Sequence, residues 1–72
     1  MRSVRVKESV ILGYPIERVE SYDAVGLLEE TRYEVLRADD GAVIGNTETL
    51  RGAQNLILSH ELEIAAQRRR AA

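Results

Sequence analysis

The stretch from Tyr33 to Ile64, YEVLRADDGAVIGNTETLRGAQNLILSHELEI, predicts a β-hairpin that runs straight into a long helix. Two runs rich in apolar and β-branched residues, 33–38 and 42–45, flank Asp39-Asp40-Gly41. Glycine readily adopts the positive φ that a tight hairpin turn requires, and aspartate is common in such turns. We therefore expect two antiparallel strands joined at these three residues. The pattern does not settle which face of the hairpin meets the helix.

The helix is expected over about residues 47–70. Asn46 is a preferred N-cap residue, and Glu48 would place a carboxylate in the first turn, where the helix dipole favours negative charge. Arg68-Arg69-Arg70 lies at the other end, where the dipole favours cations. These signals predict an α+β fold in one small domain, with three or four antiparallel strands within residues 3–46 followed by one long C-terminal helix.

At about 100° per residue, this helix carries two apolar stripes. A helix of about 24 residues would be about 36 Å long, whereas a compact domain of this size has a radius of gyration of about 11 Å. One small sheet can hardly cover both stripes, so we expect the second to contact another chain. The first stripe is Leu50, Ala53, Leu56, Ile57, His60 and Ile64; the second is Leu58, Leu62 and Ala65, with Ala66 at its edge.

A first strand is predicted over about residues 3–13, where valine recurs at alternate positions. The run Lys7-Glu8-Ser9 interrupts the alternation, which indicates either a β-bulge or a tight turn between two short strands. Gly13-Tyr14-Pro15 is expected to end the strand, because proline donates no ladder hydrogen bond.

Residues 16–30 fit two structures. Apolar residues from Ile16 to Leu27 follow a helical spacing, but Gly26 is unfavourable inside a helix. The alternative is a strand at residues 25–28 that turns through residues 29–31 into the next strand. We favour the strand.

Composition narrows the function classes. The chain has 72 residues, no cysteine and a single histidine, His60, which leaves no disulfide, no thiolate metal site and no histidine cluster. A chain this short is marginally stable on its own, and oligomerisation is the stabilising device that remains. The net charge of −2 argues against coating nucleic acid by charge alone. No signal peptide or membrane span is recognised, so we expect a soluble, cytoplasmic protein.

Residues 35–48 form an ordered pattern: an apolar residue, a basic residue and alanine, a turn ending in glycine, then Val-Ile and a Thr-Glu pair before the helix. This pattern resembles the signature of the YegP-like family of small domains of unknown function. The resemblance implies antiparallel strands followed by a helix and implies no activity. Residues 49–52 depart from the family pattern. The matching residues are Val35, Arg37, Ala38, Gly41, Val43, Ile44, Thr47 and Glu48.

No residue is assigned a catalytic, cofactor-binding or metal-binding role. Histidine is the side chain whose ordinary pKa lies nearest neutrality, but the sequence nominates no nucleophile or pocket that could work with His60. Asp39-Asp40 is accounted for by turn chemistry, and Glu29-Glu30 lacks the alternating spacing of a calcium loop. We therefore do not expect an enzyme.

The leading hypothesis is a non-enzymatic interaction or regulatory module that acts as a homo-oligomer through Leu58, Leu62, Ala65 and Ala66. The alternative is a small nucleic-acid-binding protein of the phage or mobile-element type. Its phosphate contacts would be Arg51 with Arg68, Arg69 and Arg70.

Overall fold

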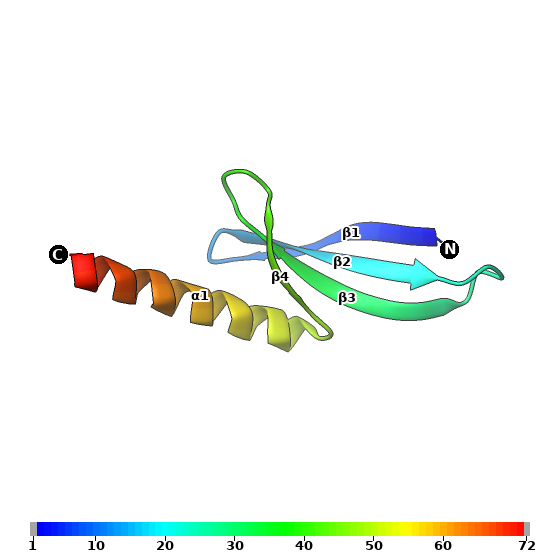
Figure 1. Cartoon of the computed structure of the whole chain (residues 1–72). Helices are drawn as coiled ribbons and strands as arrows, with labels where there is room; N and C mark the ends of the chain where they lie inside the picture. Colours follow the sequence, from blue (N-terminus) through cyan, green and yellow to red (C-terminus); the bar gives the residue numbers. More distant parts are fainter. Residues whose placement is uncertain (1, 72) are drawn as a thin grey trace.

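The computed structural model describes residues 2–71 as a four-stranded antiparallel sheet followed by one helix (Figure 1). The strands lie side by side in chain order, so each pairs with its sequence neighbour. The predicted α+β fold is confirmed. The elements are β1 (Arg2–Ile11), β2 (Tyr14–Tyr22), β3 (Leu28–Leu36), β4 (Val43–Thr47) and α1 (Leu50–Ala71).

The first strand is long and bulged. Its register with β2 shifts between Lys7 and Ser9, which identifies the interruption in the valine pattern as a β-bulge. The two-residue turn Leu12-Gly13, with φ values of 51° and 84°, has the positive angles of a type I′ hairpin turn. β1 ends at Ile11 and β2 already begins at Tyr14. Tyr14 and Pro15, predicted to end the first strand, therefore lie in the second, where Pro15 pairs with Val10.

The strand favoured for residues 16–30 is present, but at a different place. β2 continues to Tyr22, and residues 29–31, expected to turn, lie inside β3. The turn forms earlier because the Asp23 carboxylate accepts hydrogen bonds from the backbone N–H groups of Val25 (3.0 Å) and Leu27 (2.9 Å). Gly26 supplies a φ of 89° in the same turn. The predicted strand at residues 25–28 is therefore wrong.

The predicted hairpin is confirmed, with Gly41 at φ 72°, but the predicted helix start is wrong. Asn46 lies in β4 opposite Glu34, and α1 begins only at Leu50. The hydroxyl of Thr49 accepts a hydrogen bond from the backbone N–H of Gly52 at 3.0 Å, so Thr49 caps the helix. Pairing with β3 extends the strand past Asn46 and moves the first turn of the helix beyond Glu48.

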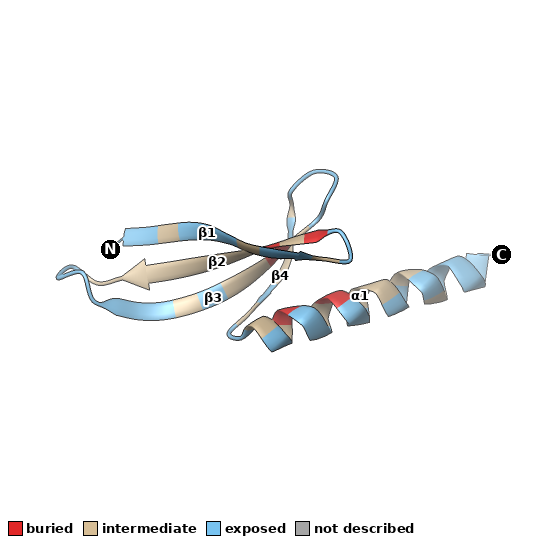
Figure 2. Cartoon of the chain, turned by 180° about the vertical axis from the view of Figure 1, so that it is seen from behind, coloured by how far each residue is buried: buried red, intermediate tan, exposed pale blue. Residues whose placement is uncertain are grey.

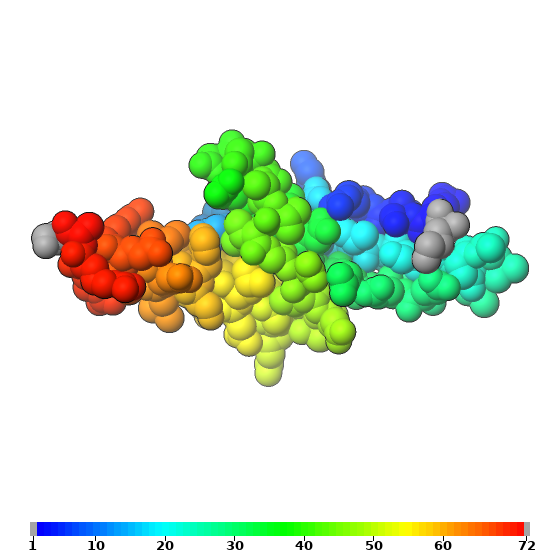
Figure 3. Space-filling view, viewed as in Figure 1, coloured from blue at the N-terminus to red at the C-terminus, as the bar shows by residue number. Residues whose placement is uncertain are grey.

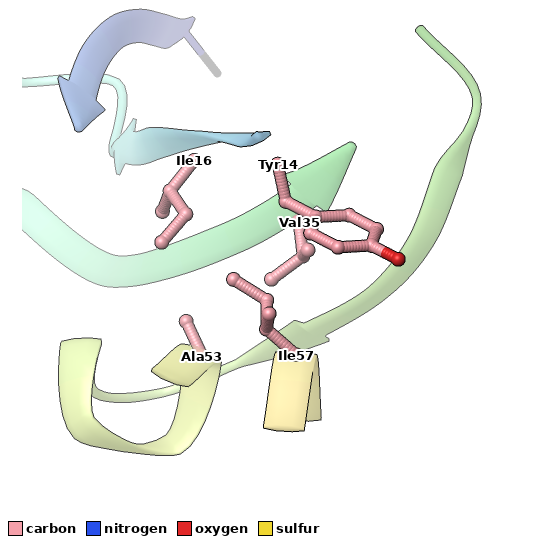
Figure 4. Close-up of a cluster of buried hydrophobic side chains, with 5 residues drawn as sticks. All are labelled: Tyr14, Ile16, Val35, Ala53 and Ile57. Carbon is pink, nitrogen blue, oxygen red and sulfur yellow. The ribbon is translucent and has the colours of Figure 1, made fainter. Parts of the chain in front are cut away.

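The first stripe of α1 lies on the sheet, as expected. Ile57 and Ala53 are fully buried against Ile16 and Val35, with Tyr14 closing one end of the cluster (Figure 4). Tyr33 packs against the same cluster, so it is the Tyr33–Val35 face of the hairpin that meets the helix. The other members of the first stripe are half-buried: Leu50, Leu56, His60 and Ile64.

The molecule is elongated, measuring 56 × 21 × 17 Å, with a radius of gyration of 14.7 Å. The helix begins near the middle of the sheet and runs out past the β1–β2 turn, so the two overlap over only part of their lengths (Figures 1 and 2). Among residues 2–71, buried side chains occur only in this overlap (Figure 2). The expectation that the helix is too long for the sheet to cover is confirmed, while the compact size assumed for the domain is wrong.

Candidate interaction surface

The C-terminal part of α1, residues 58–71, projects beyond the sheet into solvent (Figure 3). It carries the second apolar stripe. We call residues 58–71 the helix arm, and Leu58, Leu62 and Ala65 the outer stripe. Leu58 is 53% exposed and Leu62 69% exposed. Leu58, Leu62 and Ala65 lie roughly 100°, 140° and 80° around the helix axis from Ile57, so the outer stripe faces to the side of α1 and not towards the sheet. Ala66, predicted at the edge of this stripe, is half-buried instead.

The helix arm ends in three exposed arginines, Arg68-Arg69-Arg70. None of them forms an ion pair within residues 2–71, and Arg70 only donates a long hydrogen bond of 3.4 Å to the carbonyl of Ala66. Arg51 lies in the first turn of α1, about 26 Å along the axis from the basic end. Of the four predicted phosphate contacts, Arg68, Arg69 and Arg70 therefore lie together at the end of α1, whereas Arg51 lies far from them.

His60 has a packing role. Its ring meets the ring of Tyr14 edge to face, with centroids 5.7 Å apart and an interplanar angle of 89°. The Tyr14 hydroxyl is hydrogen-bonded to the carboxylate of Glu61, and this acceptor, together with burial, raises the pKa of Tyr14. A tyrosine with a raised pKa stays protonated at neutral pH and is a weaker nucleophile. The placement of His60, Tyr14 and Glu61 is thus explained by their contacts with one another at the end of the core.

The acidic pair of the β3–β4 turn is also accounted for locally. Arg37 donates two hydrogen bonds to the carboxylate of Asp40, from Nε at 2.9 Å and from Nη2 at 2.6 Å. The backbone N–H of Ala42 donates to the same carboxylate at 3.0 Å. Together these bonds lower the pKa of Asp40 to about 2. Within the described part of the chain, no group of three acidic, histidine or cysteine side chains is placed to hold a metal ion.

This ion pair predicts an acid-sensitive hairpin. Because the pKa of Asp40 is lower in the folded chain than its ordinary value of 3.8, the pair stabilises the fold above about pH 4, and this contribution is lost as the pH falls towards 2. We expect carboxyl NMR to show Asp40 titrating near pH 2, and Arg37→Gln to return the midpoint towards 3.8. An ordinary midpoint for Asp40 in the unmodified protein would contradict the pairing.

One surface was not predicted from the sequence: a shallow hollow of about 540 Å³ at the far end of the sheet. Arg2 and Val4 of β1 line it together with Tyr22 and Asp23. The alternation of valines in the first strand was the available signal, because it predicts an apolar face longer than one helix end can cover.

Comparison with protein-family models, curated proteins and solved structures finds no match to this chain. The resemblance of residues 35–48 to the YegP-like family therefore stays a prediction. No helix within residues 2–71 is both long and apolar enough to cross a membrane. Any functional conclusion must rest on the surfaces described above.

Proposed function

We propose that this protein is a non-enzymatic interaction module that works as a homo-oligomer, with the outer stripe as its contact surface. The observation that carries the proposal is the exposure of Leu58 and Leu62 on a helix that extends past its own sheet. Exposed leucines are common singly, but here two lie one turn apart and continue into Ala65.

The small core supports the same conclusion. The buried cluster is confined to Tyr14, Ile16, Val35, Ala53 and Ile57. Burying one leucine side chain fully contributes about 1.5–3 kcal/mol. Covering the two exposed leucines with a second copy would therefore add a contribution that is large beside the marginal stability of a domain this small.

The test is the absolute mass in solution, measured by size exclusion with light scattering over a range of concentrations. We expect an oligomer for the unmodified protein and a shift to monomer for Leu62→Glu, because a carboxylate would be buried without a partner. The matched control is Ser59→Glu, which adds the same charge at an exposed position outside the outer stripe. A monomer at every concentration, or Leu62→Glu leaving the mass unchanged, would refute the proposal.

A second candidate function is nucleic-acid binding by Arg68, Arg69 and Arg70. The observation in its favour is that Arg5, Arg18, Arg32 and Arg37 all form ion pairs, whereas these three have none within residues 2–71. A fluorescent DNA duplex should then bind with an affinity that falls steeply with salt, and replacing the three arginines by alanine should abolish binding. Absence of binding at low salt would refute this candidate.

A further inference from the structure

The only Asp-Gly peptide bond of the chain lies in the β3–β4 turn. Asp40 precedes Gly41, whereas the other two aspartates precede residues that carry side chains, and neither asparagine precedes a glycine. The turn projects from the molecule, and residues 37–41 are exposed (Figure 2). Glycine has no Cβ to shield its backbone nitrogen, and its backbone has the widest conformational range of any residue. This bond is therefore the point at which the chain is most open to rearrangement into isoaspartate.

The rearrangement exchanges one amide bond for another. The backbone nitrogen of Gly41 attacks Cγ of Asp40 and forms a new C–N bond, while its proton and the hydroxyl of the protonated carboxyl leave together as water. Water then opens the resulting five-membered succinimide. Cleavage of the C–N bond at Cγ restores aspartate, whereas cleavage at the main-chain carbonyl carbon leaves isoaspartate, in which the chain runs through Cγ. The reaction therefore needs a protonated carboxyl and a backbone nitrogen that is free to approach Cγ.

The carboxylate of Asp40 is held at both oxygens. Its Oδ2 accepts a hydrogen bond from Nη2 of Arg37 at 2.6 Å. Its Oδ1 accepts from Nε of Arg37 at 2.9 Å and from the backbone N–H of Ala42 at 3.0 Å. The two guanidinium bonds fix the orientation of the carboxylate. The same bonds lower the pKa of Asp40 from 3.8 to about 2, so the protonated fraction at neutral pH is more than about tenfold smaller than for an ordinary aspartate.

The attacking nitrogen is held separately. The backbone N–H of Gly41 donates to the carbonyl of Arg37 at 2.9 Å, and the backbone N–H of Arg37 donates to the carbonyl of Ala42 at 2.8 Å. Burial does not supply this restraint, because the side chains of Arg37 and Asp40 are 51% and 52% exposed. The hydrogen bonds of the turn are thus what holds the two reacting atoms in place, and Arg37 contributes to both through its side chain and its main chain.

We propose that the Asp40–Gly41 bond is a site of isoaspartate formation that Arg37 holds closed, with its guanidinium fastening the carboxylate and its carbonyl fastening the nitrogen that attacks it. The modification starts when the guanidinium releases the carboxylate. This proposal is independent of self-association, because the turn contains no residue of the outer stripe.

Isoaspartate at position 40 has a structural consequence. It adds one carbon atom to the main chain of the turn, directly before β4. Ile44 of β4 packs against the buried cluster, and Gly45 lies close to Leu56 of α1. A longer turn shifts these contacts or opens the hydrogen bonds that close the hairpin. We therefore expect the isolated isoaspartate form to unfold at a lower urea concentration than the unmodified protein.

The test compares rates of isoaspartate formation at residue 40 near neutral pH, followed over time by proteolytic digestion and electron-transfer fragmentation in the mass spectrometer. The unmodified protein unfolded in guanidinium chloride gives the unrestrained rate. We expect the folded protein to react about tenfold more slowly or less, and Arg37→Gln to regain about tenfold, since hydrogen bonds to a charged group are the strong ones. The matched control is Arg32→Gln, which removes another exposed, ion-paired arginine and should leave the rate unchanged.

Amide hydrogen exchange at Gly41 separates the side chain of Arg37 from the backbone of the turn. Faster isoaspartate formation in Arg37→Gln with the Gly41 amide still protected would assign the effect to the guanidinium. Loss of that protection would overturn the assignment, because an open turn accounts for the faster reaction by itself. Equal rates in Arg37→Gln and Arg32→Gln, or a folded protein that reacts as fast as the unfolded one, would also overturn the proposal.

Discussion

Replacing Ile57 by alanine is expected to lower the free energy of unfolding by about 2–5 kcal/mol, the range for removing a large aliphatic side chain from a closed core. Ile57 has no exposed surface and touches a cluster that also contains Ile16 and Val35. It is one of two α1 residues that are fully buried, the other being the small Ala53. A loss of this size is comparable to the whole stability of a small domain, so the variant should be largely unfolded at 25 °C.

The measurement is urea unfolding followed by circular dichroism, at one fixed protein concentration so that association does not vary. Val10→Ala is the matched control, because Val10 is also aliphatic but is 67% exposed and lies outside the buried cluster. The control should change stability by less than about 0.5 kcal/mol. Ile57→Val should fall between the two, at about 0.5–1.5 kcal/mol. An Ile57→Ala variant as stable as the control would mean that α1 does not pack on the sheet as described.

Gly45→Val is expected to destabilise the protein by about 1–3 kcal/mol through overpacking. Gly45 lies where β4 passes close to α1, and a Cβ atom there would lie 2.5 Å from Cδ1 of Leu56. The sign of the effect is diagnostic, because valine is otherwise more favourable than glycine in a strand. The Cδ1 atom is the end of a flexible side chain, so Gly45→Ala should cost less than valine.

A double-mutant cycle isolates this contact. Leu56→Ala removes the side chain that collides with the new valine, so the double variant should be more stable than the sum of the two single changes predicts, by about 0.5–3 kcal/mol. Additive effects would show that the valine collides with something other than Leu56. A Gly45→Val protein at least as stable as the unmodified one would contradict the close approach of β4 and α1.

The local signals in the sequence were sufficient for the element types. The turn chemistry of Asp39-Asp40-Gly41 and the apolar spacing from Leu50 to Ile64 predicted the β3–β4 hairpin and the sheet-facing side of α1. Both signals act over a few residues, where backbone conformation and side-chain periodicity leave little choice. The exposed outer stripe was predictable for the same reason, since it depends only on helix geometry and length.

Element boundaries depended on competition that the sequence does not display. Asn46 and Thr49 are both good N-cap residues, and pairing with β3 kept Asn46 in a strand. Asp23 and Gly26 are unfavourable in a helix, but their presence does not show where the turn forms. The position of the turn is fixed by the hydrogen bonds that the Asp23 carboxylate accepts. For Asn46 the decisive partner lies in β3, which a local pattern does not display. For Asp23 the partners are N–H groups two and four residues further along the chain, and the conformation of the turn decides which of them its carboxylate reaches.

By itself the sequence therefore determined an antiparallel sheet, a long helix with two apolar stripes and the absence of any disulfide. Only the tertiary structure decided that the helix meets one end of the sheet and leaves the other end of the same face uncovered. The physical reason is that coverage depends on where the chain crosses the sheet. That crossing is set by the length of β4 and by the close approach of Leu56 to Gly45, which together direct α1 out past the β1–β2 turn.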